Sequence, residues 1–270
     1  MNEIAIKWYK QLGFPAECDE DFYEYARTKS VDEIDVPTAV EFLNEAKDPT
    51  LSLLFFLSQL DNTQAGYNRK GILQKYFDAA VNRLKSDALA CKATTGKLGI
   101  IANGWTNGFI CRMSHYRINR LDFTIECAVD HWHGGDDIKD GDPISAVHIP
   151  GGEPLDPQAC LDSFDEAREF FKSYFPEHKF KYFACGSWLL DETLDRFLKP
   201  DSNIVKFRRM FTLYKSIESD SAIGHVFPAG TTRENIADIM PTTSLQKKMQ
   251  EYVMDGGKLY VTFGKIRSNL

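Results

Sequence analysis

The sequence predicts an α+β fold in which an N-terminal helical domain is followed by a mixed β-sheet flanked by helices. Apolar residues recur at helical spacing over residues 1–95, where no strand pattern of any length occurs. From residue 96 onward, alternation of apolar and polar residues dominates. Residues 142–198 have the order strand, glycine loop, helix, strand and helix, which is typical of a right-handed crossover between parallel strands. We therefore expect two domains, residues 1–95 and residues 96–270.

Three patterns define helices expected in the first domain. Ile4, Trp8 and Leu12 share one helical face, and the Gly-Phe-Pro that follows ends this helix. Residues 51–60 are apolar nearly all round, which indicates a buried helix. A further apolar face, on a helix over residues 71–90, is formed by Leu73, Phe77, Ala80 and Leu84.

Strands are expected in the second domain on both sides of the crossover. Residues 98–102 and 109–113 flank two Asn-Gly pairs, which is a hairpin signature. Residues 121–129 alternate between apolar and polar side chains, which favours a half-buried antiparallel strand. Residues 203–217 are predicted to form a strand pair or one long bent strand, and residues 258–266 a closing strand.

The crossover contains the stretch with the clearest functional meaning. A strand starts at Pro143 and leads into Pro150-Gly151-Gly152, after which Asp156 and Pro157 open a helix as its cap and first-turn residue. A glycine turn before a helix N-terminus presents backbone N–H groups and the positive end of the helix dipole, which together suit phosphate. The same residues also suit a tight turn that binds nothing, and the sequence leaves both interpretations open.

The rest of the crossover and the C-terminal part follow from local signals. Pro176 ends the first helix, residues 180–185 form the second strand, and a second helix opens near Asp191. The pairs Thr231 with Glu234 and Thr243 with Gln246 both have capping-box spacing, so each is expected to start a helix.

Composition excludes several classes of protein. A net charge of −7 argues against general nucleic-acid binding. No run approaches the roughly 18 apolar residues of a membrane span, and the first residues show no signal-peptide pattern, so we expect a cytoplasmic protein without a membrane partner. The six cysteines form no CxxC pair and are expected to be reduced, buried thiols that act as small hydrophobes.

Three segments resemble a known family. HIPGGEPLDPQACLDSFDEAREFF, CGSWLLDETLDRFL and DSNIVKFRRMF are similar to bacterial proteins with an N-terminal helical acyltransferase domain and a GNAT-like C-terminal domain. In GNAT acyltransferases a splayed mixed sheet takes acyl-CoA between its fourth and fifth strands. The resemblance therefore implies an acyl-CoA-dependent N-acyltransferase with a small-molecule amine as acceptor, acyl-CoA as cosubstrate and no metal. A homodimer is compatible with the sequence.

The resemblance also assigns the cofactor-binding residues. It implies that acyl-CoA meets the end of the fourth strand and the loop after it, at Ile149, Gly151 and Gly152, and the helix opened by Asp156. One departure matters: the usual GNAT loop carries Gln or Arg before its glycines, whereas this loop lacks a basic residue and contains Glu153. A carboxylate there repels pyrophosphate unless it points away.

Acyl transfer to an amine needs a base, an acid for the leaving thiolate and donors for the carbonyl oxygen. Glu126, on the polar side of its strand, is a candidate base or a solvated strand residue. His148, at the end of the fourth strand, is a candidate for proton transfer or an ordinary core histidine. Ser187, after the fifth strand, is a candidate acid or orienting group for the thiolate.

Other functions stay open at this stage. The departure at Glu153 favours a catalytically silent small-molecule-binding protein on the same fold. A less favoured alternative is a metal-dependent hydrolase that uses His131 and His133, since His-x-His on an extended segment places both rings on one side. A basic cluster is either a contact for a CoA phosphate or a charged surface, and consists of Lys206, Arg208 and Arg209.

Overall fold

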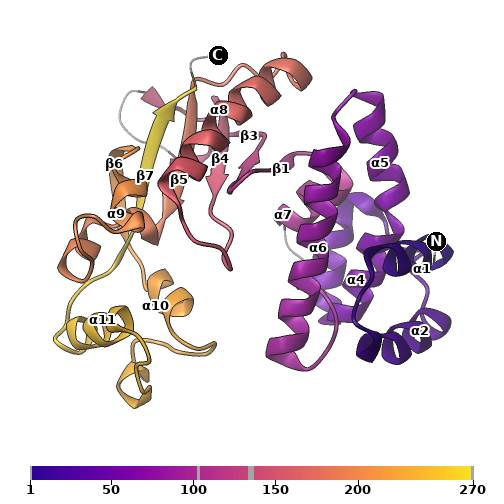
Figure 1. Ribbon diagram of the computed structural model, residues 1–270, viewed down its shortest axis with the longest axis horizontal. Coiled ribbons are helices and arrows are strands. Elements are labelled where there is room, and N and C mark those ends of the chain that lie inside the picture. The colour runs from indigo at the N-terminus through magenta and orange to yellow at the C-terminus, as the bar shows by residue number, and fades with distance from the viewer. Residues whose placement is uncertain (1, 102–103, 133–136, 269–270) are drawn as a thin grey trace. The chain divides into compact units, whose positions relative to one another are not determined.

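The computed structural model describes residues 2–101, 104–132 and 137–268. The chain forms two compact units, Met1–Ile118 and Asn119–Leu270 (Figure 1), and each is described on its own. The last long helix of the first unit ends at Thr95, where the predicted first domain ends, and the compact units divide after Ile118. The division into functional domains at residue 95 stays a prediction.

The first unit is helical up to its last strand. Its elements are α1 (Asn2–Leu12), α2 (Asp19–Thr28), α3 (Ala39–Ala46), α4 (Pro49–Ser58), α5 (Leu60–Arg69), α6 (Gln74–Thr95), α7 (Gly104–Asn107), a π-helix (Gly108–Arg112) and β1 (His115–Ile118). The buried helix expected over residues 51–60 is confirmed as α4. Asp48 caps it by accepting from the backbone N–H of Thr50 at 3.1 Å, and its residues from Leu53 to Leu57 are fully buried.

The hairpin expected over residues 98–113 is wrong. Residues 98–101 form no regular element, residues 104–112 form α7 and the π-helix, and residues 102–103 lie outside the described part of the chain. Phe109 and Ile110 are buried, and the Thr63 hydroxyl of α5 donates to the carbonyl of Ile110. Tertiary packing against α5 therefore outweighs the local turn preference of the Asn-Gly pairs.

The second unit contains a mixed sheet, so the predicted α+β class is confirmed. Its strands are β2 (Leu121–Thr124), β3 (Glu126–Cys127), β4 (Pro143–His148), β5 (Tyr182–Ser187), β6 (Thr212–Glu218) and β7 (Tyr260–Arg267). Within this unit they lie in the order β2-β4-β5-β7-β6, and β3 pairs with β4. The pair β4–β5 is parallel and the pairs formed by the other strands of this unit are antiparallel, as the predicted crossover requires. The strand expected over residues 121–129 is interrupted at Ile125.

The helices of the second unit are α8 (Pro157–Tyr174), α9 (Asn203–Arg208), α10 (Ser221–Val226) and α11 (Ser244–Met254). α8 is the predicted crossover helix, and α11 starts at the predicted capping box of Thr243 and Gln246. The first half of the strand expected over residues 203–217 is α9 instead. Near Asp191 the chain forms short 3-10 turns rather than a long helix.

The second predicted capping box, at Thr231, starts no helix. The Thr231 hydroxyl donates to the carbonyl of Pro228 at 2.7 Å, and the Asn235 side chain accepts from the backbone N–H of Thr232. These side chains therefore stabilise a turn, which is the common competing use of short polar residues.

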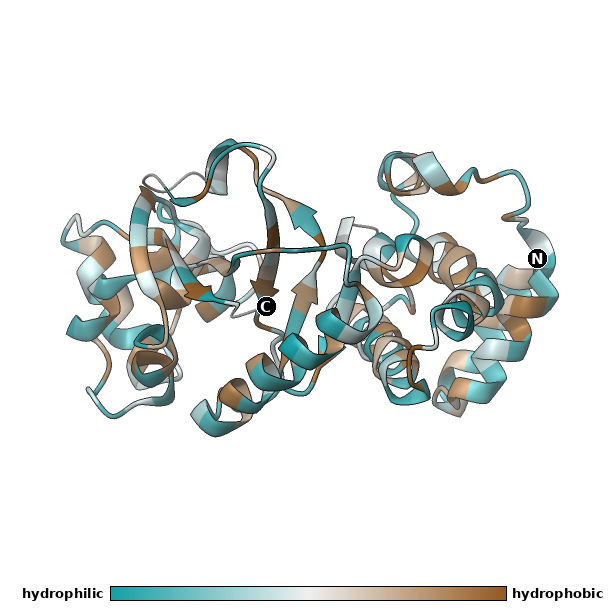
Figure 2. Cartoon of the chain, turned by 90° about the horizontal axis from the view of Figure 1, so that it is seen from above, coloured by the Kyte–Doolittle hydropathy of each residue, from teal (hydrophilic) through white to brown (hydrophobic). Residues whose placement is uncertain are grey.

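Two apolar layers position the sheet. On one face, Phe123 and Phe183 pack against Phe164 of α8 with ring centroids 5.3–5.7 Å apart. The other face is covered by the segment after β3 through Trp132, which meets Phe263 of β7 edge to face at 5.7 Å. Figure 2 shows the resulting pattern, with long hydrophobic stretches in the central strands and alternating hydrophilic and hydrophobic residues along α8.

Candidate functional site

The candidate site lies where β4 and β5 separate. The two strands pair only at Ser145 with Phe183 and at Ala146 with Ala184, over the residues that the structure describes. Beyond these pairs, toward their C-terminal ends, β4 forms the described strand pairs with β2, and β5 forms them with β7. Val147 and His148 pair with β2, while Cys185, Gly186 and Ser187 pair with β7. The facing edges of β4 and β5 therefore open at their C-terminal ends.

Alternation along the strands decides which side chains share a face. Phe123 packs on α8, so its neighbour Asp122 lies on the opposite face of the sheet. Directly opposed residues of antiparallel strands share a face, and Asp122 is opposite His148. Glu126 is opposite Ile144 of β4 and lies on this same face. The sheet thus brings Glu126 and His148 to one face.

His148 is exposed, whereas Asp122 opposite it is only 2% exposed. Residues opposed in this way have Cβ atoms about 4.5–5.5 Å apart. A buried carboxylate at this distance can orient an imidazole ring and stabilise the charge that the ring gains on taking a proton. His148 is therefore the better placed of the two candidate bases.

Glu126 and Ser187 have other partners. The Thr124 hydroxyl donates to Glu126 Oε1 at 2.6 Å, which occupies one oxygen of the half-buried carboxylate. The Ser187 hydroxyl accepts from the backbone N–H of Leu189 at 3.1 Å and so caps a 3-10 turn. Ser187 also lies on the α8 face of the sheet, one residue after Gly186, and is not brought together with His148. Its role as an acid stays a prediction.

The loop after β4 combines two glycines with a capped helix start, the features on which the predicted phosphate site rests. Gly152 has φ +86°, a left-handed conformation that favours glycine, and a Cβ added at Gly151 or Gly152 meets no atom within 4 Å. Asp156 caps α8 by accepting from the backbone N–H of Ala159 at 2.9 Å. The Glu153 side chain is exposed. Ile149, half-buried, connects β4 to this loop.

Sequence reasoning missed Arg120, which is 6% exposed and lies just before β2. Its Nε donates to the carbonyl of Pro154 at 2.8 Å and its Nη2 to the carbonyl of Glu153 at 2.9 Å. Its backbone N–H donates to Ser163 Oγ of α8 at 2.9 Å. No sequence pattern connects residues this far apart. The place of Asp122 opposite His148 was also missed, although its polar position in an alternating strand was visible.

Arg208, the middle residue of the basic cluster, has a mainly structural role. Arg208 is 6% exposed and donates to Asp195 at 2.6 Å and to the carbonyl of Asp191 at 3.1 Å. Asp191 in turn accepts from the backbone N–H of Tyr260 at 2.9 Å. Lys206 and Arg209 remain exposed side chains of α9 and its end.

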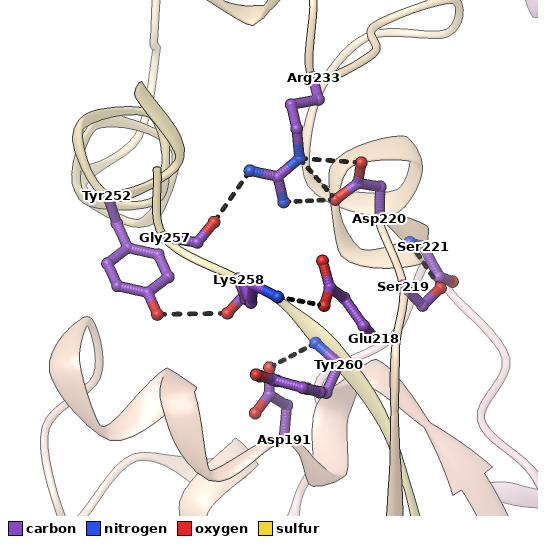
Figure 3. A network of polar contacts seen from close by, with 10 residues as sticks. All are labelled: Asp191, Glu218, Ser219, Asp220, Ser221, Arg233, Tyr252, Gly257, Lys258 and Tyr260. Carbon is purple, nitrogen blue, oxygen red and sulfur yellow. Dashed lines mark hydrogen bonds and ion pairs between the residues drawn. The ribbon is translucent and has the colours of Figure 1, made fainter. Parts of the chain in front are cut away.

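A second polar network holds the neighbouring ends of β6 and β7 (Figure 3). The Arg233 guanidinium bonds both carboxylate oxygens of Asp220, at 2.6 and 3.0 Å, and the carbonyl of Gly257 at 2.8 Å. Lys258 pairs with Glu218 at 2.8 Å. The network fixes the open end of the sheet without contributing a candidate reactive group.

Metal binding finds no support among the described residues. There, no three His, Cys, Asp or Glu side chains are grouped so that they could hold an ion. His133 lies outside the described residues, and the His131 side chain is not described either, so the pair proposed as metal ligands is untested. In the part of the chain that the structure describes, no helix is long and apolar enough to cross a membrane.

The family model for a GNAT-like C-terminal domain matches residues 115–266. The chain belongs to this family. Its GNAT-like C-terminal domain contains β4, β5 and the loop between β4 and α8, so the predicted family is confirmed. No curated protein matches the chain.

Solved structures of two acyltransferase complexes share the fold of this GNAT-like chain. One is an acyltransferase in complex with decanoyl-CoA and teicoplanin, with a TM-score of 0.77, 22% identity, and coverage of 98% of this chain and 88% of that chain. Another is an acyltransferase in complex with decanoyl-CoA, with a TM-score of 0.74, 25% identity, and coverage of 97% and 86%.

Proposed function

We propose that this chain is an acyl-CoA-dependent N-acyltransferase of the GNAT type, acting on a small-molecule amine. The observation that carries the proposal is the separation of β4 from β5 directly before a glycine loop and the capped N-terminus of α8. This arrangement offers the facing edges of β4 and β5 to an extended ligand and an electropositive helix end to its phosphates. Family membership and the acyl-CoA bound by similar structures support it.

In the proposed reaction the CoA pyrophosphate lies at the loop of Gly151 and Gly152, and the pantetheine lies between the strands. Backbone N–H groups at the opening donate to the thioester carbonyl oxygen and stabilise the oxyanion. The amine attacks the carbonyl carbon while His148, oriented by Asp122, takes a proton from its nitrogen. The C–S bond then breaks, and the CoA thiolate takes up a proton. Glu126 is the alternative base.

Binding of acyl-CoA and turnover should be tested separately. Calorimetric titration with CoA, acetyl-CoA, octanoyl-CoA and decanoyl-CoA measures binding. Amide formation is then followed by mass spectrometry with amine acceptors, beginning with amine-bearing glycopeptides because a similar structure contains teicoplanin. The expected result is saturable binding of acyl-CoA with release of free thiol upon addition of an acceptor. A wild-type protein that binds no CoA at millimolar concentration sinks the proposal.

A catalytically silent binding protein on the same fold is the second candidate. The observation that favours it is the exposed Glu153 in a loop without a basic residue of its own. It predicts no turnover with any amine acceptor, and weak or no binding of CoA because the Glu153 carboxylate repels pyrophosphate.

A further inference from the structure

The loop between β4 and α8 lacks a basic residue in sequence, but a buried guanidinium lies against it in space. We propose that Arg120 is a positioning residue that holds this loop ready for the CoA pyrophosphate, which rests on the proposed function. Arg120 comes from the turn before β2 and contacts the carbonyls of two consecutive loop residues, Glu153 and Pro154.

These two contacts determine which polar groups the loop can present. In a trans peptide the C=O and N–H bonds point in opposite directions. The carbonyl of Pro154 points toward Arg120, so the N–H of the next residue, Leu155, points away from the guanidinium. The two carbonyl oxygens, which would repel an anion, are thereby turned inward. The residue after Glu153 is Pro154, which has no N–H, so the two contacts leave one backbone donor, the N–H of Leu155, on the side away from Arg120. Open space also remains beside Gly151, where an added Cβ would meet no atom within 4 Å.

The same residue ties the loop to the start of α8. Its backbone N–H donates to Ser163 Oγ, and Ser163 donates to the carbonyl of Ala159 at 2.7 Å in the first turn. The charge of Arg120 also acts on Cys160 in the first turn of α8. Burial raises the pKa of the Cys160 thiol to about 11, and the positive charge of Arg120 opposes this rise. Arg120 therefore couples loop, helix N-terminus and β2 into one rigid cradle.

The positions of Glu153 and Arg120 also explain how a loop proposed to bind pyrophosphate can contain a glutamate. Its backbone carbonyl is held by Arg120 at 2.9 Å and its side chain is exposed. A guanidinium buried behind the loop supplies positive charge to a loop that lacks the basic residue of the usual GNAT loop. An arginine with only 6% exposure has little water to screen that charge.

The test compares Arg120→Gln and Arg120→Lys with the matched control Arg168→Gln. Arg168 is on α8 and, like Arg120, donates to a backbone carbonyl, that of Ser268 at 2.7 Å, but it contacts no loop residue through the bonds described. Amide hydrogen exchange over residues 149–156 measures positioning without ligand. Titrations with CoA, inorganic pyrophosphate and S-acetyl-pantetheine, which lacks pyrophosphate, measure binding.

We expect Arg120→Gln to speed exchange in residues 149–156 and to weaken CoA and pyrophosphate binding roughly tenfold or more, since bonds to charged groups contribute that much. S-Acetyl-pantetheine binding and kcat at saturating acyl-CoA should change little. Arg120→Lys should restore part of the affinity, and Arg168→Gln should leave both readouts unchanged.

Two results with Arg120→Gln overturn the inference: unchanged exchange and affinity, or an equal loss of affinity for S-acetyl-pantetheine and CoA, which shows a general structural role. A wild-type protein that binds neither CoA nor pyrophosphate also overturns it. Binding of pyrophosphate that depends on Arg120, without binding of any acyl-CoA, supports the cradle and removes only the acyltransferase proposal.

Discussion

Strand β5 has two different sides. Toward β7 it is paired along its whole length, from Tyr182 opposite Arg267 to Ser187 opposite Thr262. Toward β4 it is paired at two positions only, Phe183 and Ala184. The same six residues therefore form one closed ladder and one open edge.

This difference between the two sides of β5 shows how one strand can contribute both to the stability of the sheet and to the binding of a ligand. The closed side satisfies backbone donors and acceptors within the sheet, and Phe263 packs over Gly186 so tightly that no side chain fits there. The open side leaves edge groups for a ligand that runs parallel to the strands. Substitutions on the closed side should thus change stability, and those on the open side should change function.

The largest expected effect is on the open side. Replacing His148 by Ala should lower kcat/KM roughly 10²- to 10⁴-fold, the usual contribution of a positioned base, with CoA affinity retained. Because His148 is exposed, the thermal midpoint should barely move. Kinetics with a saturating acceptor and a thermal melt check both parts. Glu126→Gln is the matched control, and a greater loss there would transfer the role of base to Glu126.

Next comes the closed side. A Cβ at Gly186 would lie 2.6 Å from the Phe263 ring, so Gly186→Val should cost about 1–3 kcal/mol of unfolding free energy through overpacking. Denaturant unfolding measures this loss. Gly151→Ala, on the open side where nothing lies within 4 Å, should stay within about 0.5 kcal/mol of the wild type. Equal losses in the two variants would abolish the distinction between the two sides.

A smaller effect is expected when the open space itself is filled. Gly151→Trp places a ring where the ligand is proposed to lie, so CoA affinity should fall roughly tenfold, about 1.4 kcal/mol. The unfolding free energy should be unchanged, because φ at Gly151 is outside the left-handed region. Calorimetry with CoA decides the matter: undiminished affinity would place the pyrophosphate elsewhere.

The smallest effect concerns pH and the paired end of β4. His178 Nε2 lies 3.0 Å from the carbonyl of Ile144, and burial lowers the pKa of this imidazole below its usual value. A lowered folded-state pKa means that stability is present above the unfolded pKa, near 6.5, and is lost as pH falls toward the folded-state pKa. Melts at pH 7.5 and pH 5.5 should therefore show a larger acid loss in the wild type than in His178→Gln. Parallel losses would show that His178 does not contribute.

The sequence revealed those features whose cause is local. Asp156 and Pro157 predict the start of α8 because capping depends on neighbouring residues alone, and the glycines before them predict the loop. The Asn-Gly pairs near residue 107 misled for the opposite reason, since contacts with α5 decide that conformation.

The site depends on contacts that sequence cannot show without the sheet. His148 was visible as a candidate at a strand end, but its relation to Asp122 requires the β2–β4 register. Arg120 was invisible because its acceptors are backbone carbonyls, which every residue has, on a loop more than thirty residues away.

The position of β7 has a consequence for the order of events during synthesis. Residues Tyr260–Arg267 are among the last of the described chain to leave the ribosome, yet they lie between β5 and β6 in the sheet. Until they emerge, Cys185, Gly186 and Ser187 lack the one strand with which they pair among the described residues. The nascent protein thus carries an exposed β-edge from the completion of β5 until β7 is made, and a growing chain in this state is prone to pair with other chains.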